Sequence, residues 1–191
     1  MKYTFLLAII FKTTISLGQT SATIDSIEQP VYDTTSMDIK STNSFYFCSI
    51  LYKIPRDCDK KDQSNCCSFT SQVFTHEKNN RSGQIGCFNG TSLFWTYYDN
   101  EKTTKNNFES LLPQFQKQMK KFEQKEIKLT VCQKPVVAYR LDCTTPESYD
   151  FSQIIFYGNI NGQNVIGQLY LHHNQKSSTD LGTLFQQIVQ F

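Results

Sequence analysis

The stretch FSQIIFYGNINGQNVIGQLYL, from Phe151 to Leu171, decides the fold that the sequence predicts. Two runs rich in β-branched and aromatic residues flank Asn161-Gly162, and Asn-Gly readily takes the positive φ angles of a two-residue type I′ turn. Such a turn pairs Ile160 with Gln163, Gly158 with Val165, Phe156 with Gly167, and Ile154 with Leu169. Most apolar residues then lie on one face. The opposite face carries Tyr157, Asn159, Gln168, Tyr170 and His172.

The same order of elements occurs earlier in the chain. Four strand-like segments come first: FYFCSILY, SFTSQVFT, GQIGCF and TSLFWTYY, with a turn at Asn89-Gly90. A helical apolar stripe follows them, made of Phe108, Leu111, Leu112, Phe115, Met119 and Phe122. Asn106 and Glu109 are spaced as a cap pair, and Pro113 either marks the first turn of this helix or kinks it. In the second half, IKLTVC, PVVAYRLDC and the hairpin precede a final helical stripe of Leu181, Leu184, Phe185, Ile188 and Val189.

These parallels predict an α+β fold made by tandem duplication of a ββββα unit, with copies at 44–126 and 127–191 that form one compact domain. The antiparallel sheet or sheets would be covered by two helices about a pseudo-two-fold axis. The sequence leaves open whether the sheets stay separate, join edge to edge or curl. The alternative is a lipocalin-like eight-stranded barrel.

The N-terminal residues predict export. Lys2, an apolar run from Phe5 to Phe11 and a small-residue stretch ending at Gly18 are typical of a secretory signal peptide over residues 1–18. A membrane anchor is the rival interpretation, but the run is shorter than the roughly 20 apolar residues that cross a bilayer. Residues 19–43 are rich in serine and threonine and predict a flexible leader. We expect a secreted protein, or one in the lumen of the secretory or endolysosomal pathway, with no membrane span.

All seven cysteines follow the signal peptide, in a compartment where pairing is the default. The segment from Cys48 to Cys58 ends in RDC, and the segment from Cys132 to Cys143 ends in RLDC. Each unit is therefore expected to hold one local disulfide, Cys48–Cys58 and Cys132–Cys143. Pairing of these cysteines between the two units is left open. The odd thiol is then expected among Cys66, Cys67 and Cys87, where it could link a dimer. A zinc site at Cys58, Cys66, Cys67 and His76 is disfavoured because no C-x-x-C pair occurs.

Two sequons, at Asn80 and Asn89, predict surface glycosylation. The net charge of +2, with acids and bases interspersed, does not predict a nucleic-acid partner. The cluster of Lys117, Lys120, Lys121, Lys125 and Lys128 also contains Glu123 and Glu126, and so indicates a solvated helix face.

No catalytic motif occurs, and we predict neither an enzyme nor a cofactor or metal site. His172 and His173 are adjacent on a strand and should point to opposite faces. Asp142, Glu147 and Asp150 are interpreted as solvated loop carboxylates.

Two binding functions remain. The first is an interaction or structural module for a protein or glycan partner. The alternative is a carrier of a small apolar or amphipathic ligand between the two units, with walls of Phe94, Trp95, Tyr97, Tyr139, Tyr157 and Tyr170. Core packing is the competing explanation for these aromatic residues.

Overall fold

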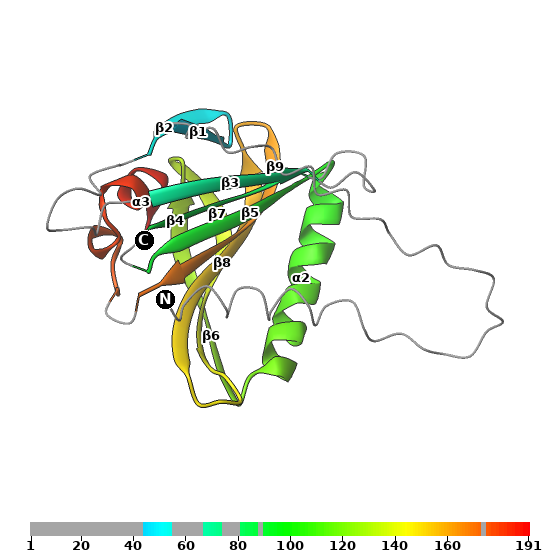
Figure 1. The fold of residues 1–191 in the computed structure, drawn as a ribbon. Helices are drawn as coiled ribbons and strands as arrows, with labels where there is room; N and C mark the ends of the chain where they lie inside the picture. The colour runs from blue at the N-terminus through cyan, green and yellow to red at the C-terminus, as the bar shows by residue number, and fades with distance from the viewer. Residues whose placement is uncertain (1–43, 55–66, 74–80, 88–89, 173–174) are drawn as a thin grey trace, which may run out of the picture. The chain divides into compact units, whose positions relative to one another are not determined.

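A computed structural model describes residues 44–54, 67–73, 81–87, 90–172 and 175–191 (Figure 1). For residues 68–73 and 81 only the backbone is described. The chain divides into two units, Met1–Val31 and Tyr32–Phe191, and every described residue belongs to the second. The predicted signal peptide and leader lie outside the described residues, as do Cys58, Cys66, His76, Asn80, Asn89 and His173.

One antiparallel sheet dominates the described chain and curls into a half-barrel (Figure 1). Its strand order is β10-β6-β7-β8-β9-β5-β4-β3. The strands are β3 (Cys67–Val73), β4 (Arg81–Cys87), β5 (Ser92–Tyr98), β6 (Lys121–Val131), β7 (Lys134–Thr144), β8 (Asp150–Ile160), β9 (Gln163–Leu171) and β10 (Val189–Gln190). A single curled sheet is compatible with the barrel-like alternative.

The predicted central hairpin is confirmed residue by residue. Strands β8 and β9 pair with Phe156 opposite Gly167 and Ile160 opposite Gln163. Asn161 and Gly162 have φ angles of 51° and 81°, which is the left-handed backbone that a type I′ turn requires. The hydrophobic pattern and the turn thus fixed the register together.

Small and large residues alternate across the middle of the sheet. Gly83 on β4 lies opposite Trp95 on β5, which lies opposite Gly167 on β9, and Gly167 lies opposite Phe156 on β8. Both glycines are covered by rings: a Cβ at Gly167 would lie 2.1 Å from Phe156 Cζ, and one at Gly83 would lie 2.3 Å from Trp95 Cζ2. Each ring therefore occupies space that its glycine leaves empty.

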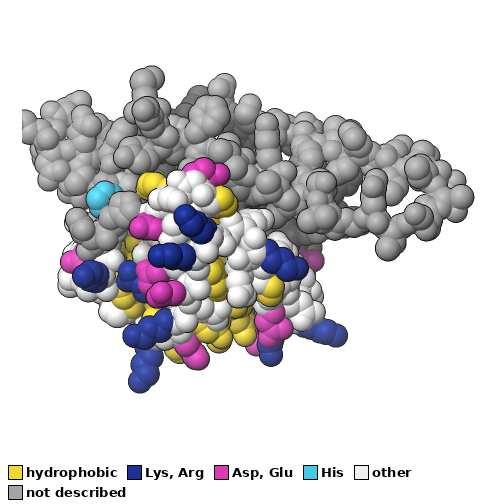
Figure 2. Space-filling view, turned by 90° about the horizontal axis from the view of Figure 1, so that it is seen from below, with side chains coloured by type: hydrophobic (Ala, Val, Ile, Leu, Met, Phe, Trp, Pro, Cys, Tyr) yellow, Lys and Arg dark blue, Asp and Glu magenta, His cyan; other side chains and the backbone are white. Residues whose placement is uncertain are grey.

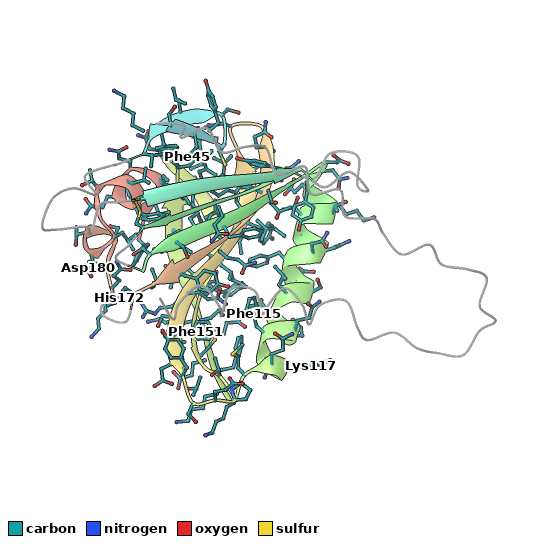
Figure 3. All side chains as sticks on the ribbon, in the orientation of Figure 1. Phe45, Phe115, Lys117, Phe151, His172 and Asp180 are labelled. Atoms are coloured by element: carbon teal, nitrogen blue, oxygen red, sulfur yellow. A yellow bond between two sulfur atoms is a disulfide. The ribbon has the colours of Figure 1, made fainter. Side chains whose placement is uncertain are left out.

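The sheet buries apolar residues on both faces. We call the face that carries Trp95 and Phe156 the inner face. Its core draws residues from all eight strands, and it is completed by the hairpin of β1 (Ser44–Phe47) and β2 (Ile50–Lys53) and by helix α3 (Thr183–Ile188). On the outer face, Ile155 and Ile166 pack with helix α2 (Glu101–Gln118). In Figure 3, Phe45 marks the β1–β2 hairpin and Phe115 marks α2, and these two residues belong to separate cores.

Helix α2 differs from its prediction at both ends. Its N-cap is Asn100, whose side chain accepts a hydrogen bond from Thr103 N, so the predicted cap pair further along lies inside the helix. Pro113 is also inside the helix and does not mark its first turn. Phe122 lies on β6, where its side chain still packs with the outer core. The lysine cluster therefore does not form the predicted helix face: Lys117 lies on α2, Lys120 lies in the connection, and Lys121, Lys125 and Lys128 lie on β6.

The predicted duplication is not confirmed. Among the described residues, β1 and β2 pair only with each other, and the first half gives β3, β4 and β5 to the large sheet. The last apolar stripe divides into a 3-10 turn η2 (Ser178–Asp180), α3 and β10. In addition, α3 packs on the inner face whereas α2 packs on the outer face, which contradicts equivalent docking of the two helices (Figure 1).

Candidate functional site

Three type I′ turns meet at one end of the half-barrel. They are Cys48-Ser49 between β1 and β2, Cys132-Gln133 between β6 and β7, and Asn161-Gly162 between β8 and β9, and all six residues have positive φ angles. Asn161 Nδ2 donates a hydrogen bond of 3.0 Å to Cys48 O, which joins the first and third turns. We call this group of turns the turn cluster.

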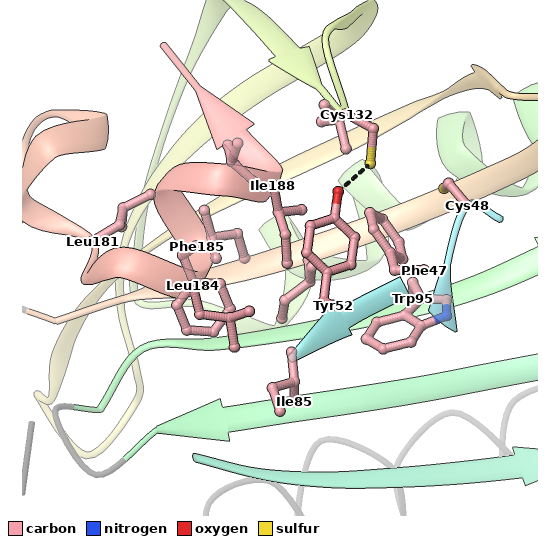
Figure 4. Close-up of a cluster of buried hydrophobic side chains, with 14 of the residues drawn as sticks. Phe47, Cys48, Tyr52, Ile85, Trp95, Cys132, Leu181, Leu184, Phe185 and Ile188 are labelled. Atoms are coloured by element: carbon pink, nitrogen blue, oxygen red, sulfur yellow. Dashed lines mark hydrogen bonds between the residues drawn. The ribbon is translucent and has the colours of Figure 1, made fainter. Parts of the chain in front are cut away.

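Two thiols and two phenols meet in the turn cluster, and Figure 4 shows both thiols and the phenol of Tyr52. Cys48 and Cys132 are both buried and unbonded, and each thiol influences the acidity of the other. The Tyr52 hydroxyl lies 3.2 Å from Cys132 Sγ, and Cys48 N donates a hydrogen bond of 2.8 Å to the Tyr97 hydroxyl. Cys132 N donates to Ile188 O at 2.8 Å, which attaches α3 to the same cluster.

The environment separates the two thiols in acidity. The hydrogen bond with Cys132 and then burial raise the pKa of the Cys48 thiol. The hydrogen bond from Cys48, helped by the one with Tyr52, lowers the pKa of the Cys132 thiol despite its burial. Burial raises the pKa of Tyr52 and of Tyr97, so both phenols stay protonated. Cys132 is therefore the thiol that loses its proton first.

A surface pocket of about 430 Å³ lies beside the turn cluster. Glutamines dominate its lining, which consists of Gln133, Thr183, Gln186, Gln187, Ile188 and Gln190. These residues come from the β6–β7 turn, α3 and β10, and none is charged. We call this hollow the glutamine pocket. The pocket was not predicted from the sequence, because it combines Gln133 of the β6–β7 turn with residues of α3 and β10 that are distant in sequence.

The structure does not gather the predicted ligand-facing aromatic residues at one site. Trp95 is 2% exposed and packs against Phe45 and Phe47 in the inner core. Tyr97 also belongs to the inner core. On the outer face, the Tyr139 and Tyr157 rings both contact Phe108 of α2, and Tyr170 lies near Phe151 at a centroid distance of 6.4 Å. Core packing accounts for most of this set.

The cysteine predictions need correction. The structure joins Cys67 to Cys87 across β3 and β4, which removes both from the candidates for the odd thiol. Cys132 and Cys143 are both unbonded, because Cys132 lies in the turn before β7 and Cys143 lies near the far end of that strand. Cys48 is also unbonded, and its predicted partner lies outside the described residues.

The predicted loop carboxylates lie partly on strands, because Asp142 is on β7 and Asp150 begins β8, whereas Glu147 lies in the connection between these strands. Asp142 lies on β7, where Arg140 Nε and the Ser152 hydroxyl donate hydrogen bonds to it. Burial alone would raise the pKa of Asp142, but these hydrogen bonds outweigh it and lower the pKa. Asp150 accepts a hydrogen bond of 2.7 Å from Thr144 Oγ1 and is exposed, as is Glu147. His172 lies just after β9 and is exposed.

The described surface carries charges of both signs. Figure 2 shows basic and acidic side chains interspersed over one face, without a field of either sign. Among the described residues, no three histidine, cysteine, aspartate or glutamate side chains are placed to hold a metal ion. No helix in the described ranges is long and apolar enough to cross a membrane.

We found no family model, no curated protein and no solved structure that matches this chain. Any functional inference must therefore come from the site itself.

Proposed function

We propose that this protein is a secreted, non-enzymatic binding protein whose glutamine pocket holds a neutral, hydroxyl-rich group, such as a glycan on a partner molecule. The observation that carries the proposal is the lining of the pocket, in which four glutamines surround about 430 Å³ without a charged residue.

The chemistry of the amide favours this ligand class. Each glutamine side chain both donates and accepts hydrogen bonds, and a sugar hydroxyl does the same. Gln133 and Gln190 are exposed, so their amides are available to a ligand, and Gln186 is exposed although its Nε2 donates a hydrogen bond of 2.9 Å to Thr179 O. Ile188 adds an apolar residue to the lining. A few convergent polar groups beside an apolar surface are typical of small-ligand sites.

Two further observations support an extracellular setting. The Cys67–Cys87 disulfide fits an oxidising compartment, and the N-terminal sequence predicts a signal peptide. The carrier alternative has less support, since Trp95, Phe156 and Phe185 fill the inner face and are almost fully buried.

The test is binding of neutral oligosaccharides of glucose, mannose and N-acetylglucosamine to the full-length protein, measured by titration calorimetry. Gln186→Ala and Gln133→Ala should each weaken binding about 5-fold to 10-fold, which corresponds to one lost hydrogen bond of about 1 kcal/mol. The matched control is Gln116→Ala, which removes an exposed glutamine on α2 and should leave the affinity unchanged. Equal losses in all three variants, or binding of none of the sugars, would contradict the proposal.

A further inference from the structure

We propose that Cys48 and Cys132 are a disulfide site, and that their bond attaches the β1–β2 hairpin covalently to the β6–β7 turn in the oxidised protein. This site is distinct from the glutamine pocket and stands whether or not the pocket binds a glycan.

The first support is the attachment of the hairpin. Within the described ranges, β1 and β2 pair with each other and add no strand to the eight-stranded sheet. The hairpin is held to the rest of the chain by buried side chains, such as Phe45 and Phe47, and by the hydrogen bonds of the Cys48 backbone with Tyr97 and Asn161. A covalent bond here would fix an element that no ladder of strand hydrogen bonds secures.

The second support is the choice of residue in the turns. Both central residues of a type I′ turn need positive φ, which favours Asn and Gly. The chain uses that pair at Asn161-Gly162, but it places a cysteine at the same position of the other two turns, at φ angles of 48° for Cys48 and 50° for Cys132. A cysteine is a poor choice for the left-handed backbone. Its presence in both turns is explained by what the side chains do together.

The third support is the local chemistry. The Cys48 and Cys132 side chains both lie in the inner core, and each thiol shifts the pKa of the other. The Tyr52 hydroxyl lies 3.2 Å from Cys132 Sγ, where it can donate a hydrogen bond to a thiolate (Figure 4). Cys132 is also the more exposed of the two, at 6% against 0% for Cys48. Cys132 is therefore suited to react first, because the thiolate is the nucleophile in disulfide exchange.

The reaction needs a disulfide as the oxidant, such as glutathione disulfide. The Cys132 thiolate attacks one sulfur of the oxidant and forms a mixed disulfide, which releases one thiol. Cys48 then loses its proton and attacks Cys132 Sγ, which releases the second thiol. In total the two cysteines give up two protons and two electrons, and the oxidant is reduced to two thiols.

The pairing would also reassign the odd cysteine. With Cys67–Cys87 and Cys48–Cys132 paired, three of the seven cysteines remain: Cys58, Cys66 and Cys143. Cys143 is buried in the outer core, away from the turn cluster, and serves as a control thiol.

The experiment is peptide mapping of the secreted full-length chain, alkylated with N-ethylmaleimide and digested without reduction. We expect one cross-linked peptide pair that contains Cys48 and Cys132. When the reduced protein is treated with glutathione disulfide, the Cys48 and Cys132 thiols should disappear together. In Cys48→Ser and in Cys132→Ser the remaining thiol of the pair should stay titratable, whereas Cys143→Ser should still form the cross-link.

Recovery of Cys48 bonded to Cys58 or Cys66, of Cys132 bonded to Cys143, or of both as alkylated thiols after oxidation would overturn the proposal. The wild-type map decides this even where a variant does not fold. Amide exchange provides the second measurement, since reduction of the bond should speed exchange in residues 44–53. Unchanged exchange in a cross-linked protein would show that the bond does not secure the hairpin.

Discussion

Gly167 has an aromatic neighbour on each side, Trp95 on β5 and Phe156 on β8. The Phe156 ring covers the glycine so closely that a Cβ would lie 2.1 Å from Cζ. Phe156 is fully buried, so its ring contributes apolar burial as well as cover for the exposed backbone of the glycine. The pair is therefore structural, as the hairpin register predicts.

Gly167→Ala should destabilise the protein by about 1 to 3 kcal/mol, because the added methyl group overpacks the space that the Phe156 ring fills. Phe156→Ala should cost about 3 to 5 kcal/mol through the cavity that it leaves. The control is Gly86→Ala, where the nearest contact of a Cβ is Ser92 Cβ at an ordinary 3.6 Å. Denaturant unfolding measures all three. If Gly86→Ala costs as much as Gly167→Ala, loss of the glycine itself and not the ring contact is responsible.

Gln153 is a buried polar side chain that the packing around it does not satisfy. It lies on β8 with 0% exposure, and neither amide atom has a hydrogen-bond partner in the part of the chain that the structure describes. A buried amide without partners loses its hydration and gains nothing in exchange.

Gln153→Leu should therefore raise the free energy of unfolding by about 1 to 3 kcal/mol. Gln163→Leu, at an exposed position of the β8–β9 hairpin, is the control and should change it little. Urea unfolding of both variants tests this. A loss of stability in Gln153→Leu would show that a buried water satisfies the amide.

At the scale of elements, α2 contains a residue that is unfavourable inside a helix. Pro113 lies inside the 18-residue helix and its side chain is exposed. Proline has no N–H to donate to the preceding turn and its ring crowds that turn. The packing of Phe108 and Phe115 against the sheet outweighs this cost.

Pro113→Ala should stabilise the protein by up to about 3 kcal/mol, because alanine restores the donor and removes the clash. The exposed neighbour Gln114 supplies the control as Gln114→Ala, for which we expect a change within about 0.5 kcal/mol. Thermal unfolding compares the two. No gain from Pro113→Ala would mean that the helix needs the bend that proline allows in order to reach the sheet.

Elements with strong local signals were predictable. The β8–β9 hairpin followed from Asn161-Gly162 and the alternation of its strands, and α2 from its apolar spacing. Its start was misplaced because Asn100 and Asn106 are both suitable caps, and only the fold shows that Asn100 is used. Its end was misplaced because Phe122 continues the helical spacing while lying on β6. Local patterns specify the type of an element better than its limits.

At the scale of the whole molecule, the candidate site was not predictable because it joins distant parts of the chain. The turns that contain Cys48, Cys132 and Asn161 meet only after the sheet has formed and curled. The assumed repeat also paired cysteines within each half, whereas the sheet places Cys132 and Cys143 near opposite ends of β7. The contacts that form the site join residues distant in sequence, and a local sequence pattern does not predict such contacts.

Cys143 and Tyr170 on the outer face should contribute to a loss of stability at high pH, in addition to the buried thiol and phenols of the turn cluster whose pKa values are also raised. Burial, and then the charge of Asp142, raise the pKa of Cys143 to about 11. Burial, and then Cys143, raise the pKa of Tyr170 to about 12. In the unfolded chain the pKa of a cysteine is about 8.5 and that of a tyrosine is about 10.

From about pH 9 upward, the unfolded state should therefore lose protons that the folded state still holds. Stability falls as pH rises wherever the unfolded state binds fewer protons, by about 1.4 kcal/mol per pH unit for each group at most. The contribution is fully present below about pH 8.5 and is lost as pH rises through about 11 for Cys143. Unfolding in urea at pH 8, 9 and 10 should show this decline, and Cys143→Ala should make it less steep between pH 9 and 10. A decline as steep in Cys143→Ala as in the native chain would assign the effect to other groups.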